Sequence, residues 1–329
     1  MTILVITIIA IALVYDFLNG MNDAANSVAT IVATRVLSPF MAVLWAAFFN
    51  FAAYFLFGLH IANTMGKGIV DPHVIEPWFV FSALIGAALW VYICTHFGLP
   101  ISVSHALIGG MVGPAWFFYG ANAVVVSGIT KVAIFIFVSP IVGFVLGYLL
   151  MVLTYWLLRK SKPGKVDHLF RILQLASSAF FSLGHGGNDA QKTMGIIAVL
   201  LFSTGYLGAE FYVPEWVVIA CYSAIGLGTL TGGWKVIKTM GVNLTDLKPV
   251  HGFSAETAGA ITLAMSSFMG IPVSTTHTIS GAIMGVGITR RVSAVRWKVA
   301  QGIIGAWVLT IPMTMVVSGL LYLLIKQFV

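Results

Sequence analysis

Two pairs of polar motifs hold the side chains of this apolar sequence that could do chemistry. Asn22-Asp23 lies in one apolar stretch, and the same pair returns as Asn188-Asp189 in a later one. Carboxylate and amide oxygens, together with carbonyl oxygens freed by a broken helix, are ligands for a hard cation, and a carboxylate can also carry a proton. We therefore expect these four residues to bind a coupling cation, sodium or a proton. If the ion is sodium, Asp23 and Asp189 are the expected metal ligands.

The second pair of motifs indicates an anion site. PISVSH begins at Pro100, PVSTTH begins at Pro272, and glycine-rich sequence follows each. A proline followed by hydroxyl residues is typical of a helix start, where free N–H groups and the positive end of the helix dipole favour an anion. The expected substrate-binding residues are Ser102, Ser104, Ser274, Thr275, Thr276, Gln191 and Lys192. The alternative for any single hydroxyl is a bond to its own helix.

Asp16, Glu256, His105 and His277 are expected to support the site. A carboxylate at membrane depth costs at least about 2.5–3.5 kcal/mol, so Asp16 and Glu256 inside apolar stretches indicate a function. Glu256 is either a partner of the site or an interfacial residue. For the two histidines we favour hydrogen bonds that pin the hairpins over anion donation or a proton relay, and no cysteine or third histidine stands beside them at zinc-ligand spacing.

Membrane helices must position these motifs. The 329 residues are 59% hydrophobic and 8% charged, whereas soluble proteins carry about 25% charged residues. A span of the bilayer core needs about 20 apolar residues. The expected spans are 3–34, 40–62, 78–97, 130–158, 171–205, 214–234, 255–270 and 298–325. Stretches 99–117 and 271–287 are predicted to be re-entrant hairpins, because lipid cannot satisfy an irregular backbone.

The two Asn-Asp motifs are expected to break their helices. The segment DFLNGMNDAANS, residues 16–27, places several polar residues in the middle of an apolar run, and Gly20 permits unwinding. The segment SLGHGGNDAQKT, residues 182–193, has the same design with three glycines. The predicted cation site therefore includes backbone carbonyls released by the unwinding.

The basic residues predict the topology. If the loop that begins at Arg159 is cytoplasmic, 13 of the 17 basic residues lie inside, in agreement with the positive-inside rule. Lys67, Lys131 and Lys326 then lie outside and Lys192 lies within the membrane. We expect a multi-pass protein of the cell (plasma) membrane with both termini extracytoplasmic. The net charge of +7 is dispersed between apolar runs, so nucleic acid is not an expected partner, whereas membrane lipid is.

The paired motifs also predict an internal duplication. The step from Asp23 to Asp189 is nearly the same length as the step from Pro100 to Pro272. With three net crossings per half, the second copy is inverted, a design typical of secondary transporters. We expect an all-α polytopic membrane protein with an inverted-topology repeat, broken helices and two re-entrant hairpins. Residues 1–158 would form the first repeat, 159–170 a cytoplasmic linker and 171–329 the second repeat. Packing by small residues would explain duplicated glycines but not a duplicated aspartate.

The motifs resemble those of the inorganic phosphate transporter (PiT) family. The resemblance lies in NGMNDAANSVAT, GHGGNDAQKTMGI and GFSAETAGAITLAMSSFMGIPVSTTH, and extends over nearly the whole chain. It implies phosphate uptake coupled to sodium or protons, a scaffold with a moving transport domain, and commonly a homodimer. It also implies that Asp23 and Asp189 bind the cation and that the hairpin hydroxyls bind phosphate. The chain departs from its own symmetry at Val103, opposite Thr275, and at Leu84, opposite Glu256.

The leading hypothesis is a secondary active symporter that imports inorganic phosphate by alternating access, with no cofactor other than the coupling ion. A sulfate symporter of the same family is the alternative. An intramembrane enzyme that uses His185, His105 or His277 is disfavoured, because no acyl- or phosphoryl-transfer motif accompanies these histidines. An anion channel would conduct without gradient-coupled accumulation.

Overall fold

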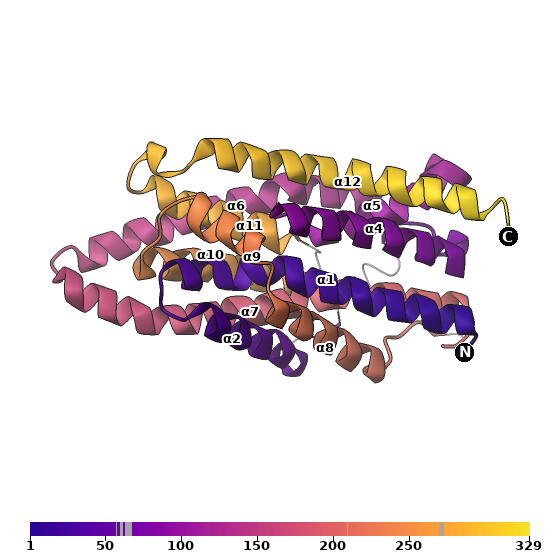
Figure 1. The fold of residues 1–329 in the computed structure, drawn as a ribbon, viewed down its shortest axis with the longest axis horizontal. Coiled ribbons are helices and arrows are strands. Elements are labelled where there is room, and N and C mark those ends of the chain that lie inside the picture. The colour runs from indigo at the N-terminus through magenta and orange to yellow at the C-terminus, as the bar shows by residue number, and fades with distance from the viewer. Residues whose placement is uncertain (57, 60–61, 63–67, 209, 270–272) are drawn as a thin grey trace.

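The apolar runs form helices that lie along one axis in the computed structural model (Figure 1). The structure describes residues 1–329 except 57, 60–61, 63–67, 209 and 270–272, so Lys67 and Pro272 lie outside the described residues. No strand occurs among the residues it describes. The helices are α1 (Ile3–Ala33), α2 (Pro39–Ala52), α4 (Pro77–Phe97), α5 (Val103–Pro114), α6 (Val126–Leu158), α7 (Pro163–Ser203), α8 (Glu215–Thr231), α9 (Trp234–Lys238), α10 (Pro249–Phe268), α11 (Thr275–Ile288) and α12 (Trp297–Ile325).

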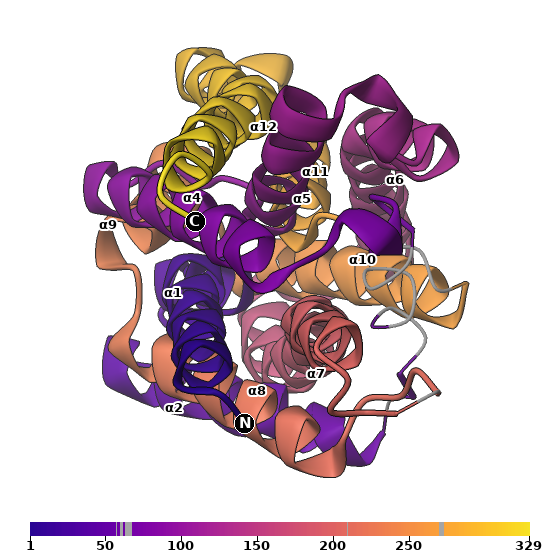
Figure 2. The same cartoon turned by 90° about the vertical axis from the view of Figure 1, so that its right-hand side faces the viewer.

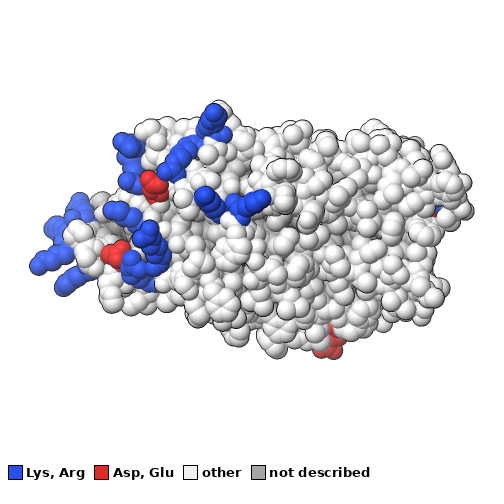
Figure 3. Space-filling view, viewed as in Figure 1, with Lys and Arg blue, Asp and Glu red and all other residues white. Residues whose placement is uncertain are grey.

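Helices α1, α4, α6 and α12 are each long and apolar enough to cross a membrane, and α8 with the helical segment after it makes a fifth candidate bent by 65°. Figure 3 shows a broad band with few charged side chains, and most visible Lys and Arg side chains gather toward one end of the molecule. We call this the basic end. Both chain termini lie at the opposite end, the terminal end (Figure 1). The prediction of an all-α polytopic membrane protein is confirmed.

Helices α1 and α7 lie side by side in the middle of the bundle (Figure 2). Helix α8 packs on α1 and α2 packs on α7, while α4 packs on α1 and α10 packs on α7. Similarly, α12 packs on α5 and α6 packs on α11. Each of these contacts therefore has a counterpart in which the two halves exchange roles, an arrangement that an internal repeat would produce.

The counterpart contacts use glycines at matching positions. A Cβ atom on Gly113 of α5 would lie 2.3 Å from the carbonyl oxygen of Met315 in α12. Gly285 of α11 stands at the matching distance from the second Pro-Ser motif, and a Cβ atom on it would lie 2.0 Å from the carbonyl oxygen of Phe144 in α6. Only glycine allows these backbones to approach so closely.

The stretches 99–117 and 271–287 are not hairpins by themselves, because their described residues hold one short helix each, α5 and α11. Each short helix instead forms a helical hairpin with the longer helix before it, α5 with α4 and α11 with α10. Glu76 precedes α4 and Tyr119 follows α5, and both bond to the hydroxyl of Tyr322, at 2.7 and 3.0 Å, so this hairpin begins and ends together. Asp246 precedes α10 and Arg290 follows α11, and the Arg290 guanidinium donates to the Asp246 carbonyl oxygen at 3.4 Å. The first hairpin therefore opens from the terminal end and the second from the basic end.

The predicted unwinding at the two Asn-Asp motifs is wrong. Helices α1 and α7 run without a break through residues 16–27 and 182–193. The glycines there serve close packing: a Cβ atom on Gly20 would lie 2.1 Å from the carbonyl oxygen of Ile225 in α8, and one on Gly186 would lie 2.4 Å from that of Asn50. A cation at these motifs would therefore be bound by side chains, because the carbonyls remain in the helix.

The connection between the halves is shorter than the predicted linker 159–170. Helix α7 begins at Pro163, where proline suits the first helical position, so only residues 159–162 join α6 to α7. The charges between Pro163 and Arg171 indicated a loop but lie on an exposed helical turn. Arg171 and Asp167 form an ion pair there at 2.9 Å with the i, i+4 spacing of a helix.

Candidate functional site

The short hairpin helices α5 and α11 meet at their N-terminal ends. The ring centroids of His105 and His277, one from each helix, lie 4.9 Å apart. Ser102 and Ser274 are the N-caps, and each hydroxyl accepts the backbone N–H of the histidine three residues later at 3.2 Å. The two helix starts therefore face each other as predicted, but these two serines bond to their own helices.

Thr275 joins the two Asn-Asp motifs. Its hydroxyl lies 3.0 Å from Asp189 Oδ2 of α7 and 3.3 Å from Asp23 Oδ2 of α1. The hydroxyl of Thr276 donates to Asp23 Oδ1 at 3.2 Å. Asn26 of α1 donates its amide to the hydroxyls of both threonines, at 3.2 and 3.0 Å. The structure thus brings both predicted cation ligands to the start of α11.

Lys192 completes the same cluster. Its ammonium group donates to Asp189 Oδ1, to Ser104 Oγ of α5 and, at 3.0 Å, to the carbonyl oxygen of Val273. The side chains of Lys192 and Asp189 are only 2% and 1% exposed. A buried lysine requires an opposite charge, so this ion pair anchors α7 to both hairpins.

His185 lies one helical turn before Asp189 and adds an imidazole nitrogen to the two carboxylates. Its Nε2 is 3.2 Å from Asp189 Oδ2 and 3.8 Å from Asp23 Oδ2. Its Nδ1 donates at 3.1 Å to the side-chain oxygen of Asn50, which can only accept. The two carboxylates and His185 offer ligand atoms within 4.8 Å of one another, a spacing that suits one cation. Sequence reasoning placed His185 outside the site, although its i, i+4 spacing to Asp189 puts both on one face of α7.

The charges of this cluster balance only when His185 is protonated. Two carboxylates face one lysine, all three at most 2% exposed, and the pair Asp23 and Asp189 shares the hydroxyl of Thr275. With a neutral His185 one negative charge is in excess, and because burial strengthens electrostatic interactions, that charge attracts a cation or a proton and repels an anion. The threonine hydroxyls and the N-terminal end of α11 are the groups that could donate to an anion once that charge is neutralised.

Several predicted residues have contacts other than those just described. Asn22 donates to the Thr95 hydroxyl at 2.7 Å and faces α4. Asn188 is buried, and Gln191 donates to the Gly187 carbonyl oxygen of its own helix at 2.6 Å. Asp16 accepts from Thr193 at 2.9 Å, a contact between α1 and α7. His277 stacks on Trp307, with ring centroids 3.9 Å apart, as a residue that pins the hairpin would.

Glu256 is the centre of a second buried cluster toward the basic end. Its carboxylate accepts hydrogen bonds from Thr30 of α1 at 2.5 Å, from Gln174 of α7 at 2.9 Å and from Ser177 of α7 at 2.5 Å. Gln174 also accepts from the hydroxyl of Thr34 at 2.8 Å. We call these five residues the Glu256 cluster. Glu256 is fully buried inside the protein, and its partners carried no sequence signal beyond being polar in apolar stretches.

The chain is similar to known phosphate transporters over its full length. The model of the "Phosphate transporter family" matches residues 19–318. A "Probable low-affinity inorganic phosphate transporter" from Rhizobium meliloti (strain 1021) is 58% identical, with 97% of this chain and 96% of that protein covered. A protein of the same description from Bacillus subtilis (strain 168) is 39% identical, with 99% and 98% covered.

A solved structure described as "The sodium-dependent phosphate transporter" shares the fold. It is 26% identical, has a TM-score of 0.91 and is covered completely, as is this chain. These relatives are transporters, which confirms the prediction that the protein is not an enzyme. Since the family model spans the helices that build both buried clusters, the chain belongs to the phosphate transporter family.

Proposed function

We propose that the protein is a secondary active symporter that imports inorganic phosphate with sodium ions or protons by alternating access. The observation that carries the proposal is the shared hydroxyl of Thr275, which lies within hydrogen-bonding distance of Asp23 and Asp189 at the start of α11. In this arrangement the groups suited to bind an anion are engaged by carboxylates. Phosphate and coupling cation therefore depend on each other at one place.

The charge of the cluster dictates the order of binding. A phosphate anion that approaches two buried carboxylates is repelled unless a cation or proton binds first. A cation between Asp23, Asp189 and His185 would neutralise the carboxylates and release the hydroxyls of Thr275 and Thr276. The released hydroxyls, the start of α11 and Lys192 then present donors to phosphate. The bound phosphate and the bound cation stabilise each other, so release of phosphate weakens cation binding. This mutual dependence couples the two fluxes.

The decisive experiment is uptake of labelled phosphate into proteoliposomes under a sodium gradient and, separately, under a proton gradient. The proposal predicts accumulation under at least one of them. Asp23→Asn and Asp189→Asn should each abolish accumulation, while protein still inserts in the membrane. Glu210→Gln removes an exposed acid away from this cluster and serves as the matched control with normal uptake. Uptake in both core variants equal to that of the wild type would refute the coupling site.

A threonine series separates binding from folding. Thr275→Ser keeps the hydroxyl that approaches Asp23 and Asp189 and should keep most uptake, whereas Thr275→Val keeps the shape and should lose it. Equal activity of these two variants would show that the hydroxyl does not participate. Excess sulfate that competes fully with labelled phosphate would favour a sulfate symporter, and conductance without accumulation would favour a channel.

The proposal includes the setting of the transporter. The basic end would face the cytoplasm by the positive-inside rule, which places both termini outside the cell membrane. The protein would work as a homodimer surrounded by lipid. Cysteine labelling of residues near Met1 and near Lys160 from each side of the membrane tests the orientation, and crosslinking in native membranes tests the dimer.

A further inference from the structure

A large cavity opens at the basic end, apart from the cluster around Asp23 and Asp189. Its volume is about 800 Å³, and its walls come from the ends of α1, α6 and α11 and the starts of α7 and α10. The charged side chains that line it are Arg35, Arg159, Arg171, Lys248, Arg290 and Asp167. Five basic side chains and one carboxylate thus line the cavity, so its net positive charge attracts an anion.

The pairing of these groups leaves positive charge unneutralised. Asp167 pairs with Arg171, whose guanidinium also donates to the carbonyl oxygen of Arg35 at 3.1 Å. Arg290 bonds to a backbone oxygen at 3.4 Å, while the nearby carboxylate of Asp246 pairs with Arg296 outside the lining. Among the described residues, neither Arg35 nor Arg290 has a carboxylate partner within ion-pair distance.

The backbone of Arg35 supplies an independent observation. Helix α1 ends there with bonds from the Arg35 N–H to the Val32 carbonyl and from the Val36 N–H to the Ile31 carbonyl, both 3.1 Å. This helix ending favours glycine, because the residue must adopt a left-handed conformation. Arg35 has φ of 57° and is the one described non-glycine residue with positive φ. Such strain of roughly 1 kcal/mol or more tends to persist where a side chain has a function.

The cavity lies at the end of a polar row on α1. Asp23, Asn26, Thr30 and Thr34 follow one another at spacings of three and four residues, so they share one helix face over about 17 Å. Asp23 and Asn26 belong to the cluster built around Asp23, Asp189, His185, Lys192, Thr275 and Thr276, which we call the central cluster. Thr30 binds Glu256, and Thr34 lines the cavity. A polar route therefore leads from the central cluster to the cavity.

We infer that this cavity is a second anion site, which binds a phosphate group at the basic end through Arg35, Arg290 and their basic neighbours. The inference rests on the proposed function for its nearest source, inorganic phosphate on its way to the cytoplasm. The headgroup of an anionic phospholipid offers the same chemistry. Guanidinium groups suit both, because they form paired hydrogen bonds with phosphate oxygens.

The test measures binding of inorganic phosphate to the Thr275→Val protein in lipid-free detergent, without any gradient, by ³¹P NMR titration. This background removes a hydroxyl donor from the cluster around Asp23 and Asp189, so the remaining saturable binding should belong to the cavity. Adding Arg35→Gly and Arg290→Gln should weaken that binding by about tenfold or more. Adding Lys160→Gln and Lys162→Gln instead removes two charges from the same end but outside the cavity and should change it little. Near 1 M salt, where the Debye length is roughly 3 Å, the control should lose much of its binding as well.

Arg35→Gly alone distinguishes binding from folding. Glycine adopts the left-handed conformation without strain. The melting temperature of the Arg35→Gly variant should therefore equal or exceed that of the wild type, while its phosphate binding falls. Equal phosphate binding by the arginine pair and the lysine pair would overturn the inference, unless the cavity holds a lipid headgroup instead. A second measurement compares nanodiscs of phosphatidylcholine alone with nanodiscs that contain phosphatidylglycerol, by native mass spectrometry. Retention of phosphatidylglycerol that depends on Arg35 and Arg290 would assign the site to the headgroup.

The proposed function and this inference fail separately. A wild-type protein that accumulates no phosphate under either gradient would refute the symporter, yet binding at the cavity would still be measured in the gradient-free titration. Conversely, gradient-driven uptake that is normal, together with phosphate and phosphatidylglycerol binding that ignore Arg35 and Arg290, would leave the symporter intact and remove the second site.

Discussion

The central cluster is enclosed differently toward the two ends of the molecule. Toward the basic end lies the Glu256 cluster, where a carboxylate receives three side-chain hydrogen bonds. Toward the terminal end lie the positions that the spacing of the repeated motifs pairs with these polar ones. They are Leu84, opposite Glu256; Ile196, opposite Thr30; Ile8, opposite Gln174; Ile11, opposite Ser177; and Leu200, opposite Thr34.

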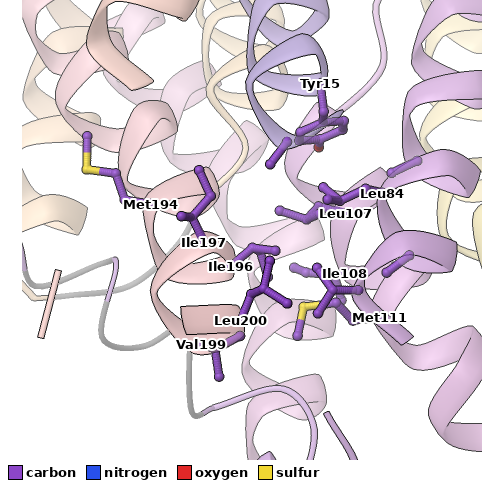
Figure 4. Packing of buried hydrophobic residues seen from close by; sticks show 14 of the residues in the cluster. Tyr15, Leu84, Leu107, Ile108, Met111, Met194, Ile196, Ile197, Val199 and Leu200 are labelled. Carbon is purple, nitrogen blue, oxygen red and sulfur yellow. The ribbon is translucent and has the colours of Figure 1, made fainter. Parts of the chain in front are cut away.

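These counterparts belong to one apolar cluster. Leu84, Ile8, Ile196 and Leu200 are buried in it, and Ile11 packs against it. Figure 4 shows Ile196 and Leu200 beside Ile108 and Met111 of α5. We call Leu84, Ile8, Ile11, Ile196 and Leu200 the Leu84 cluster. The same helix positions are thus polar in one half and apolar in the other.

This difference indicates how ions and water could pass between the central cluster and each end of the molecule. An apolar seal excludes water and ions, whereas a hydrogen-bonded seal offers replacement partners to a passing ion or water at each step. The polar row on α1 ends in the basic cavity, while its counterpart on α7 ends among isoleucine and leucine side chains. In the proposed symporter, passage between the central cluster and the terminal end would therefore require helices to move apart, whereas passage to the basic end would require side chains to exchange partners.

Leu84→Glu tests the comparison with the largest expected effect. It places in the apolar cluster the residue that the other half carries, but without the donors that surround Glu256. A carboxyl group at that depth costs at least about 2.5–3.5 kcal/mol, so we expect little folded protein in the membrane, measured by fluorescence-detected size exclusion. Leu84→Met preserves volume and polarity and is the control. Normal yield of the glutamate variant would show that this end is hydrated.

Glu256→Leu makes the opposite change and should have the next largest effect. It leaves Thr30, Gln174 and Ser177 without their common acceptor, at about 1–3 kcal/mol for each group that finds no other partner. We expect a lower melting temperature and loss of phosphate uptake. Glu256→Gln keeps an acceptor and should retain more stability than the leucine variant. A leucine variant as stable and active as the wild type would contradict the role of a polar seal.

Much of the fold was predictable because it follows from local composition. Apolar runs predicted the spans, and a proline before hydroxyl residues predicted the starts of α5 and α11. The continuous course of α1 was not predictable, because a glycine such as Gly20 in a polar segment favours unwinding on local grounds. Its role depends on a contact with the carbonyl oxygen of Ile225, a residue of α8 that no local pattern brings near.

The site was predictable in part for the same reason. Asp23 and Asp189 were expected at the site because the aspartate repeats and is costly in lipid, and Thr275 was expected there because it belongs to a proline-hydroxyl motif. The structure brings the three together. The direction of a side chain around its helix was not accessible. Asn22 precedes Asp23 directly, so successive residues point about 100° apart on a helix, and it faces Thr95 instead. The sequence around Gln174 did not predict its role, because its hydrogen-bond partner Glu256 lies on another helix, α10.

Thr30→Ile converts one position of the Glu256 cluster into its counterpart, Ile196. It removes one donor from Glu256 and replaces the hydroxyl by an ethyl group, one heavy atom larger, in a packed site, a change that should cost about 1–3 kcal/mol. We expect reduced phosphate uptake and a moderate decrease in melting temperature. Thr30→Ser restores the hydroxyl without the added bulk and should recover most uptake. If serine and isoleucine behave alike, the hydrogen bond to Glu256 is irrelevant to transport.

Thr34→Val should have the smallest effect and concerns the last member of the polar row, opposite Leu200. Valine keeps the shape but cannot donate to Gln174, and one such hydrogen bond contributes about 0.5–1.5 kcal/mol. Because Gln174 still donates to Glu256, the Glu256 cluster itself should persist and the melting temperature should fall only slightly. Thr34 also lines the basic cavity, so the rate of phosphate efflux from preloaded proteoliposomes should decrease more than the melting temperature suggests. Efflux that falls only in proportion to stability would mean that the polar row is a structural support and that phosphate leaves by another path.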